Sequence, residues 1–154
     1  MKKGFTLIEL LVVIGIIIML MLVIYPQFQN SQDRARITAI GSDLKNIASA
    51  LEQFYADWGK YPGAGGTPSY TVLKNELTGS GGTINTSTNK TVLGESGPKV
   101  YMTSSAFTSL ENTVGGATIT YTLNGTTYTI SVTIPTASGN KTISVTNGGV
   151  ISVS

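Results

Sequence analysis

Hydrophobic and polar positions follow three successive patterns along the chain, and the first is a nearly continuous apolar run. This run extends from Phe5 to Tyr25, and its interruptions are Thr6, Glu9 and Gly15. A helix of about 20 residues is roughly 30 Å long, which is enough to cross the hydrocarbon core of a bilayer. The first pattern therefore predicts a hydrophobic transmembrane helix over residues 5–31.

The second pattern is a stripe of apolar residues spaced alternately three and four positions apart. Its members are Ile37, Ile40, Leu44, Ile47, Leu51, Phe54 and Trp58. This spacing places them on one face of a helix, with polar residues on the other faces. We predict an amphipathic helix over residues 32–59 whose stripe forms a helix-to-sheet core. Pairing of two such helices as a coiled coil is the alternative.

The two segments together predict one long helix from Phe5 to about Trp58. Pro26 removes a donor from the backbone ladder of that helix, and Gly15 lowers the helix propensity upstream of it. A kink or a looser stretch is therefore expected between these two residues.

Residues 60–117 carry no sustained periodicity and are predicted as a loop region. Gly59 is a suitable C-cap for the preceding helix, and Pro62 prevents its continuation. Within the region, "SYTVLKNELTG" predicts one short helix capped by Ser69. A loop this long is uncommon in a compact domain, so it is either functional or contains structure that the pattern does not reveal.

The third pattern is strict alternation over residues 118–154. "TITYTLNGTTYTISVTI" alternates apolar and Thr-rich positions around Asn124-Gly125, a pair suited to a hairpin turn. "KTISVTNGGVISVS" repeats the arrangement around Asn147-Gly148-Gly149. We predict about four antiparallel strands with one apolar face. The fold class is therefore α+β, with a long N-terminal helix packed by its second half on a C-terminal sheet.

Composition excludes most catalytic chemistry. Charged residues make up 12% of the chain, and it contains neither histidine nor cysteine. These absences rule out disulfides, thiolate nucleophiles and a Ser-His-Asp triad. The sequence contains no phosphate-binding loop or dinucleotide fingerprint. We predict a protein that is not an enzyme and has no metal site and no cofactor.

The charge distribution argues against nucleic acid as a partner. The formal net charge is +2, and Lys2 and Lys3 supply it, so the remaining chain is neutral. No specific nucleic-acid site is therefore expected. The two lysines before the apolar run favour a cytoplasmic N-terminus, whereas Arg34 and Arg36 on its far side weaken that preference.

Glu9 is the unusual residue of the apolar run, because an acid in a membrane span costs free energy and usually marks a function. A secretory signal would need a small-residue cleavage site after the run, which the sequence lacks. A plain membrane anchor leaves Glu9 unexplained. The third interpretation is a cut between Gly4 and Phe5, which would create an α-amino group as a partner for such an acid.

"KKGFTLIELLVVIGII" resembles the class III leader and N-terminal helix of bacterial type IV pilins and type II secretion pseudopilins. The resemblance implies that residues 1–4 are a leader, that a prepilin peptidase cuts between Gly4 and Phe5, and that Phe5 is then N-methylated. It also implies that Phe5, Thr6 and Glu9 act in assembly, with the Glu9 carboxylate paired to the N-terminal amine of a neighbouring subunit.

The resemblance further implies a precursor in the cytoplasmic membrane and an extracellular filament. Its partners would be other copies of itself in a helical homopolymer, and the pilus or secretion assembly machinery of the inner membrane. In such filaments the helix is commonly melted between a glycine and a proline placed like Gly15 and Pro26, with a simple kink as the alternative. The likeness is dense over the first 30 residues and architectural beyond residue 62.

Within this family, a major pilin is favoured over a pseudopilin because the surface is neutral and Thr-rich. The acidic calcium-binding loop typical of major pseudopilins has no counterpart, since no acid follows Glu111. A membrane-anchored module that binds a ligand through residues 63–117 is the alternative from another class. Candidate glycosylation sites in N-x-S/T triplets are Asn85, Asn89, Asn124 and Asn140.

Overall fold

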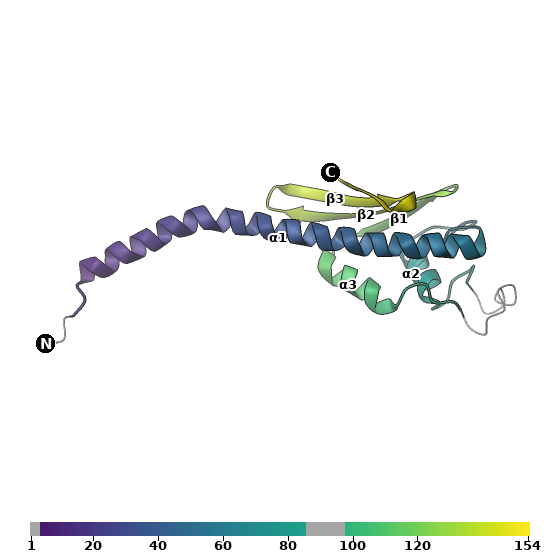
Figure 1. Ribbon diagram of the computed structural model, residues 1–154, viewed down its shortest axis with the longest axis horizontal. Helices are drawn as coiled ribbons and strands as arrows, with labels where there is room; N and C mark the ends of the chain where they lie inside the picture. Colours follow the sequence, from purple (N-terminus) through teal and green to yellow (C-terminus); the bar gives the residue numbers. More distant parts are fainter. Residues whose placement is uncertain (1–3, 86–97) are drawn as a thin grey trace.

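The computed structural model of the chain describes residues 4–85 and 98–154. Its elements are α1 (Leu7–Trp58), α2 (Tyr70–Thr78), α3 (Ser104–Val114), β1 (Ile119–Asn124), β2 (Thr127–Thr136), β3 (Gly139–Thr146), the 3-10 turn η2 (Asn147–Gly149) and β4 (Val150–Val153). Figure 1 shows α1 as the long axis of the molecule, with its first half projecting alone. Its second half lies between the sheet and the pair α2 and α3. The predicted α+β fold is confirmed.

Helix α1 runs for 52 residues without a break. Thr6 is its N-cap, so the helix begins at Leu7 rather than at Phe5. Gly59 is its C-cap, and the Gly59 N–H donates to the Tyr55 carbonyl at 2.8 Å. Gly59 adopts the left-handed conformation (φ 66°), which a residue without a side chain takes at little cost.

The four strands form an antiparallel sheet in the order β1-β2-β3-β4, as the alternation predicted. In β2 every second residue from Tyr128 to Ile134 is buried. Ile130 pairs with Tyr121 on one side and with Val145 on the other, so the buried residues of three strands share one face. Threonine and serine predominate on the opposite face.

The first hairpin turns at Gly125 and Thr126, one residue later than the predicted Asn124-Gly125 pair. Asn147 in η2 holds this register. Its Oδ1 accepts a hydrogen bond from the Tyr128 N–H, and its Nδ2 donates to the Thr126 carbonyl, both at 2.7 Å. A side chain from the second turn therefore positions the first, which the local sequence pattern does not show.

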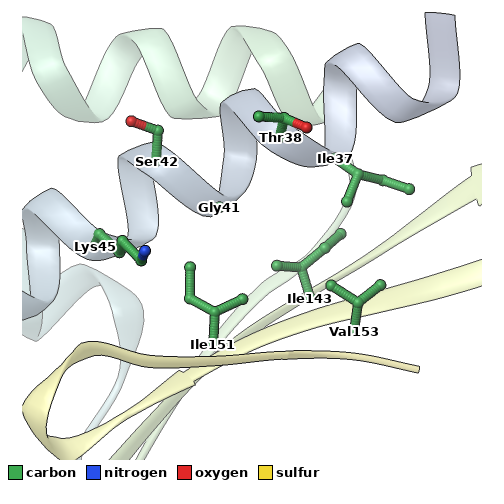
Figure 2. A pocket seen from close by; sticks show the side chains of 8 residues that line it. All are labelled: Ile37, Thr38, Gly41, Ser42, Lys45, Ile143, Ile151 and Val153. Atoms are coloured by element: carbon green, nitrogen blue, oxygen red, sulfur yellow. The ribbon is translucent and has the colours of Figure 1, made fainter. Parts of the chain in front are cut away.

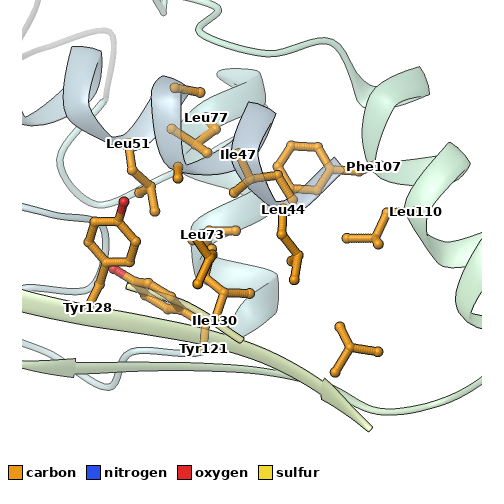
Figure 3. Close-up of a cluster of buried hydrophobic side chains, with 14 of the residues drawn as sticks. Leu44, Ile47, Leu51, Leu73, Leu77, Phe107, Leu110, Tyr121, Tyr128 and Ile130 are labelled. Atoms are coloured by element: carbon orange, nitrogen blue, oxygen red, sulfur yellow. The ribbon is translucent and has the colours of Figure 1, made fainter. Parts of the chain in front are cut away.

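All three helices contribute apolar side chains to one core against the buried face of the sheet (Figure 3). The stripe residues of α1 with at most 1% exposure are Ile40, Leu44, Ile47, Leu51 and Phe54. Ile37 and Trp58, at the two ends of the stripe, are half-buried against the same core. The stripe is thus covered within one chain, without a coiled-coil partner.

Helix α3 lies in the region predicted as loop, so that prediction was wrong for residues 104–114. Serine and threonine occupy many of its positions and lower its intrinsic propensity. Phe107, Leu110 and Val114 lie at helical spacing and are buried, which indicates that tertiary packing stabilises the helix. Helix α2, by contrast, was predicted correctly, with Ser69 as its N-cap.

The edge of the sheet formed by β4 is only partly covered. Helix α1 lies mainly over β3, and one helix about 10–12 Å wide cannot cover four strands spaced about 4.8 Å apart. Val153, predicted on the covered face, is 49% exposed. Figure 2 shows the resulting open pocket of about 410 Å³ between Ile37 and Gly41 of α1 and Ile143, Ile151 and Val153 of the sheet.

Candidate assembly and processing site

The residues predicted for processing lie at the exposed start of the chain. Gly4 and Phe5 precede α1 in no regular element, and the Phe5 side chain is 83% exposed. Exposed, non-helical segments near chain ends are the preferred sites of proteolytic cleavage. The Gly4–Phe5 peptide bond has this environment, while residues 1–3 of the predicted leader lie outside the described residues.

Glu9 is held by the start of its own helix in the isolated chain. Its Oε2 accepts hydrogen bonds from the Thr6 N–H at 2.9 Å and from the Thr6 hydroxyl at 2.7 Å. The Thr6 Oγ1 in turn accepts from the Glu9 N–H at 3.3 Å. This reciprocal pair is a capping box, which satisfies donors that every helix start leaves unpaired. The capping box was not among the predictions from sequence, although Thr-x-x-Glu before an apolar run is its signature.

The capping box leaves Glu9 able to accept another partner. Both bonds from Thr6 reach Oε2, so Oε1 retains acceptor capacity. A cut before Phe5 preserves the Thr6 N–H, because that group belongs to the Phe5–Thr6 peptide bond. In the part of the chain that the structure describes, no cation forms an ion pair with Glu9. An external amine can therefore join the carboxylate without opening the cap.

The apolar half of α1, up to Phe28, lies away from the hydrophobic core of the head. The head is the second half of α1 together with residues 60–154. The large apolar side chains from Phe5 to Phe28 are 47–83% exposed. Within the described residues, α1 is the one helix long and apolar enough to cross a membrane, with a window of mean hydropathy 3.2 that contains no buried residue. Apolar surface on this scale needs a cover of lipid or of other protein chains.

Gly15 and Pro26 both lie inside this projecting half, where α1 remains helical and Figure 1 shows it bending. A side chain at Gly15 would meet nothing within 4 Å in the isolated chain. Packing inside the molecule therefore gives no reason for glycine at this position. Melting of the helix between Gly15 and Pro26 in a filament stays a prediction.

Two polar contacts join the beginning of the amphipathic half to the head. Arg36 donates from Nε to the Thr113 carbonyl at 2.8 Å and from Nη2 to the Val114 carbonyl at 2.6 Å, which caps the C-terminus of α3. Asp33 Oδ2 accepts from the Ala137 N–H at 2.7 Å, at the turn between β2 and β3. Neither role could be predicted from local sequence, because each partner lies more than 70 residues away.

Further along α1, Glu52 joins the helix to both hairpin ends. Its Oε1 accepts from the Tyr128 hydroxyl at 3.3 Å and from the Gly148 N–H at 3.2 Å, and its Oε2 accepts from the Tyr61 hydroxyl at 3.1 Å. Burial, followed by the hydrogen bond to Glu52, raises the pKa of Tyr61 to about 12. These contacts keep the Tyr61 phenol protonated and hold the η2 turn against α1.

The last turn of α1 carries a separate polar cluster. Asp57 Oδ2 accepts from Lys99 Nζ at 2.6 Å and from the Tyr101 hydroxyl at 2.7 Å, and Trp58 Nε1 donates to the Tyr101 oxygen at 2.8 Å. The hydrogen bond from Lys99, followed by that from Tyr101, lowers the pKa of Asp57. The segment before α3 is thereby tied to the end of the long helix.

The structure separates the candidate glycosylation sites by accessibility. Asn85 is 1% exposed, and its Nδ2 donates to the carbonyls of Glu76 and Lys99, so its side chain is closed to modification in the folded chain. Asn124 and Asn140 are exposed, at the hairpins of the sheet. Asn89 lies outside the described residues.

Comparison with known proteins found one family profile and several relatives that match part of the chain. The profile of the prokaryotic N-terminal methylation motif matches residues 1–25. Type II secretion system core protein G of Pseudomonas aeruginosa is 39% identical over 61 residues, which are 40% of this chain and 43% of that protein. A fimbrial protein of Neisseria meningitidis serogroup B is 33% identical over 79 residues, 51% of this chain and 46% of that protein.

The type IV major fimbrial protein FimA of Dichelobacter nodosus is 37% identical over 57 residues, which are 37% of this chain and 36% of that protein. The matched stretch thus spans less than half of the length of these relatives. No solved structure matches the chain.

Proposed function

We propose that this chain, which carries the prokaryotic N-terminal methylation motif and is homologous to type IV pilins and to type II secretion core protein G, is the major structural subunit of an extracellular filament of the type IV pilus class. Its precursor would wait in the cytoplasmic membrane. A prepilin peptidase would cut between Gly4 and Phe5 and methylate Phe5, and the inner-membrane assembly machinery would then build a helical homopolymer.

The observation that supports this proposal is the contrast between the two halves of α1. The second half contributes buried residues to the core of the head, whereas the first half is apolar, exposed and able to span a membrane. The same apolar surface can be covered first by lipid and later by equivalent helices of other subunits. Such head-to-tail contacts do not close on themselves, so they generate a filament rather than a ring.

In this proposal, Glu9 selects the subunits that can join the filament. The carboxylate keeps its capping box with Thr6 and accepts the Phe5 amine of a neighbouring subunit through its remaining acceptor capacity. In an apolar filament core, an unpaired acid is strongly unfavourable, and a subunit in the correct register removes that penalty. A subunit that retained its leader would not provide the amine at this position.

A type II secretion pseudopilin is the second candidate, and the 39% identity to core protein G over 61 residues favours it. Against it, the described residues contain no cluster of three or more acidic groups that could hold a metal ion. The neutral, Thr-rich outer face of the sheet also suits the wall of a long exposed fibre. A membrane-anchored binding module remains the alternative from another class, and part of its proposed region, residues 86–97, lies outside the described residues.

The experiment combines mass spectrometry of the exported protein with electron microscopy of sheared surface material. The proposal expects Phe5 as a methylated first residue and abundant long fibres. Retained Met1 would favour the anchored module, and short pseudopili seen only with a secretion apparatus would favour the pseudopilin. Glu9→Lys should be processed normally but form no fibres, whereas the surface control Glu111→Gln should be processed normally and should form fibres. Normal fibres from Glu9→Lys would refute the pairing role.

A further inference from the structure

A polar crevice lies where the apolar half of α1 meets the head. It has a volume of about 270 Å³ and lies between α1 and the turn that joins β2 to β3. Its lining residues are Asn30, Asp33, Arg34, Ile37, Thr136, Ser138 and Lys141. A second polar crevice of about 300 Å³ shares Asp33 and Thr136 with it and adds Gln29 and Gln32.

The crevice carries two cations that the molecule itself does not neutralise. Within residues 4–85 and 98–154, neither Arg34 nor Lys141 forms an ion pair, and no hydrogen bond from either side chain is described. Asp33 is the acid of the crevice, but its Oδ2 already accepts the Ala137 N–H at 2.7 Å. Two cations and one engaged carboxylate leave the crevice with a net charge of +1.

The position of the crevice along α1 places it at the level of lipid headgroups. Arg34 follows Tyr25, the last residue of the apolar run, by nine residues, or roughly 14 Å of helix. The headgroup layer extends about 5–8 Å beyond the hydrocarbon core on each side. A long arginine side chain can reach back across the remaining distance while its stem lies along the helix.

We propose that this crevice binds the phosphate of an anionic phospholipid headgroup while the chain resides in the membrane. The Arg34 guanidinium offers a planar fork of donors, and the Lys141 ammonium adds a point charge from the neighbouring strand. The side chains of Asn30 and Ser138 line the same space and can bond to headgroup hydroxyls. The lipid thereby joins α1 to the β2–β3 turn and fixes the height of the head above the bilayer.

The two arginines of the sequence make a direct test feasible, because each has one Nε–Hε group that NMR can observe. The Arg36 group donates to the Thr113 carbonyl inside the protein and serves as an internal control. The full chain would be placed in phosphatidylcholine bicelles and titrated with phosphatidylglycerol. We expect the Arg34 signal to shift to saturation while the Arg36 signal stays in place.

Two lysine variants and a titration with inorganic phosphate test whether the shift reports lipid binding at this crevice. Lys141→Gln should weaken the phosphatidylglycerol dependence of the Arg34 shift about five-fold, the equivalent of about 1 kcal/mol per cation at an anionic surface. Lys60→Gln, an exposed lysine beyond the far end of α1, should leave it unchanged. Inorganic phosphate added without phosphatidylglycerol should not saturate the signal at comparable concentration.

The proposal is overturned if Arg34 does not respond, if both arginine signals shift together, or if Lys60→Gln weakens binding as much as Lys141→Gln. Saturation by inorganic phosphate at equal concentration would also overturn it, because the site would then bind a free anion and not a lipid. The proposal rests on the membrane-resident precursor. The proposed cleavage acts at the Gly4–Phe5 bond and the proposed subunit pairing uses Glu9, so failure of the Arg34–Lys141 site and failure of the proposed function are distinguishable.

Discussion

Replacing Glu76 by glutamine would test how the segment after α2 is held on the head. Glu76 is fully buried in α2. Its Oε1 accepts from the N–H groups of Thr83 and Ile84, and its Oε2 accepts from the Asn85 N–H at 2.7 Å. The Thr83 hydroxyl also donates to Oε1, at 3.2 Å. The donors described for this buried carboxylate are all neutral, so it acts as an anchor for successive backbone N–H groups.

The glutamine side chain has nearly the same shape but only one acceptor oxygen. Whichever way the amide turns, its NH₂ group faces at least one backbone N–H that previously had an acceptor. A buried donor left without a partner costs about 1–3 kcal/mol. In a chain of this size, 1 kcal/mol lowers the melting temperature by about 2–4 °C. The melting temperature of Glu76→Gln should therefore fall by about 2–12 °C.

The assay follows the fluorescence of Trp58, the single tryptophan, in the full chain held in neutral detergent. Trp58 donates to the Tyr101 hydroxyl at 2.8 Å, so its emission reports loss of tertiary structure in the head. Glu111→Gln is the matched control. Its carboxylate bonds to Lys74 at 2.7 Å, and the two side chains are 31% and 36% exposed, so it should lose less than about 1 kcal/mol. Equal melting temperatures for the two variants would refute the anchoring role of Glu76.

Gly82→Ala tests the contact between Glu76 and the segment after α2 by changing that segment instead of the carboxylate. A Cβ on Gly82 would overlap the Glu76 carboxylate, which forces the loop or the carboxylate to move. Gly82 has no positive φ, so the expected loss of stability comes from this overlap and not from backbone strain. Gly66→Ala is the control, because its Cβ would meet no atom closer than 3.9 Å. If the two alanine variants have the same melting temperature, the close approach of Gly82 to Glu76 does not contribute to stability.

Arg36→Met removes both hydrogen bonds that cap α3, so urea unfolding should show a loss of about 1–3 kcal/mol. Arg34→Met, whose side chain makes no described hydrogen bond, should stay within about 0.5 kcal/mol of the parent. Leu44→Ala leaves a cavity in the core and should cost about 2–5 kcal/mol by the same measurement. The contribution of tyrosine to the free energy of unfolding should be constant below pH 10 and fall between pH 10 and 12. In that range the unfolded Tyr61 has lost its proton, whereas burial raises the folded pKa of Tyr61 to about 12. The slope should reach about 1.4 kcal/mol per pH unit for each such tyrosine, and an unchanged slope in Glu52→Gln would contradict the contribution of that acid.

The candidate site was visible in the sequence to different degrees. Glu9 and the Gly4–Phe5 bond stood out because a lone acid in an apolar run has few explanations, and the methylation-motif profile matches this stretch. The capping role of Thr6 had a signature of four residues, Thr6 to Glu9, that was overlooked. Arg34 looked like a charge that affects only membrane topology, since the Lys141 that shares its crevice is more than 100 residues away.

Spacing along the chain was sufficient for the long helix, α2 and the four strands. Each of these depends on a period of 3.6 or 2, on a cap or on a turn residue, and such features are contained in short windows. The hairpin register and α3 required more, because they depend on Asn147 and on burial of Phe107 against the rest of the core.

Contacts between distant segments decided the polar anchors that join α1 to the rest of the head. Arg36 meets α3 across 77 residues, Glu52 meets η2 across 96, and Asp33 meets the β2–β3 turn across 104. A hydrogen bond depends on the position of its two atoms in space, and a sequence window specifies position only over a turn or a strand. Local periodicity therefore determined which elements form, whereas the packing of those elements determined which charged side chains meet and which, like Arg34 and Lys141, remain available for another molecule.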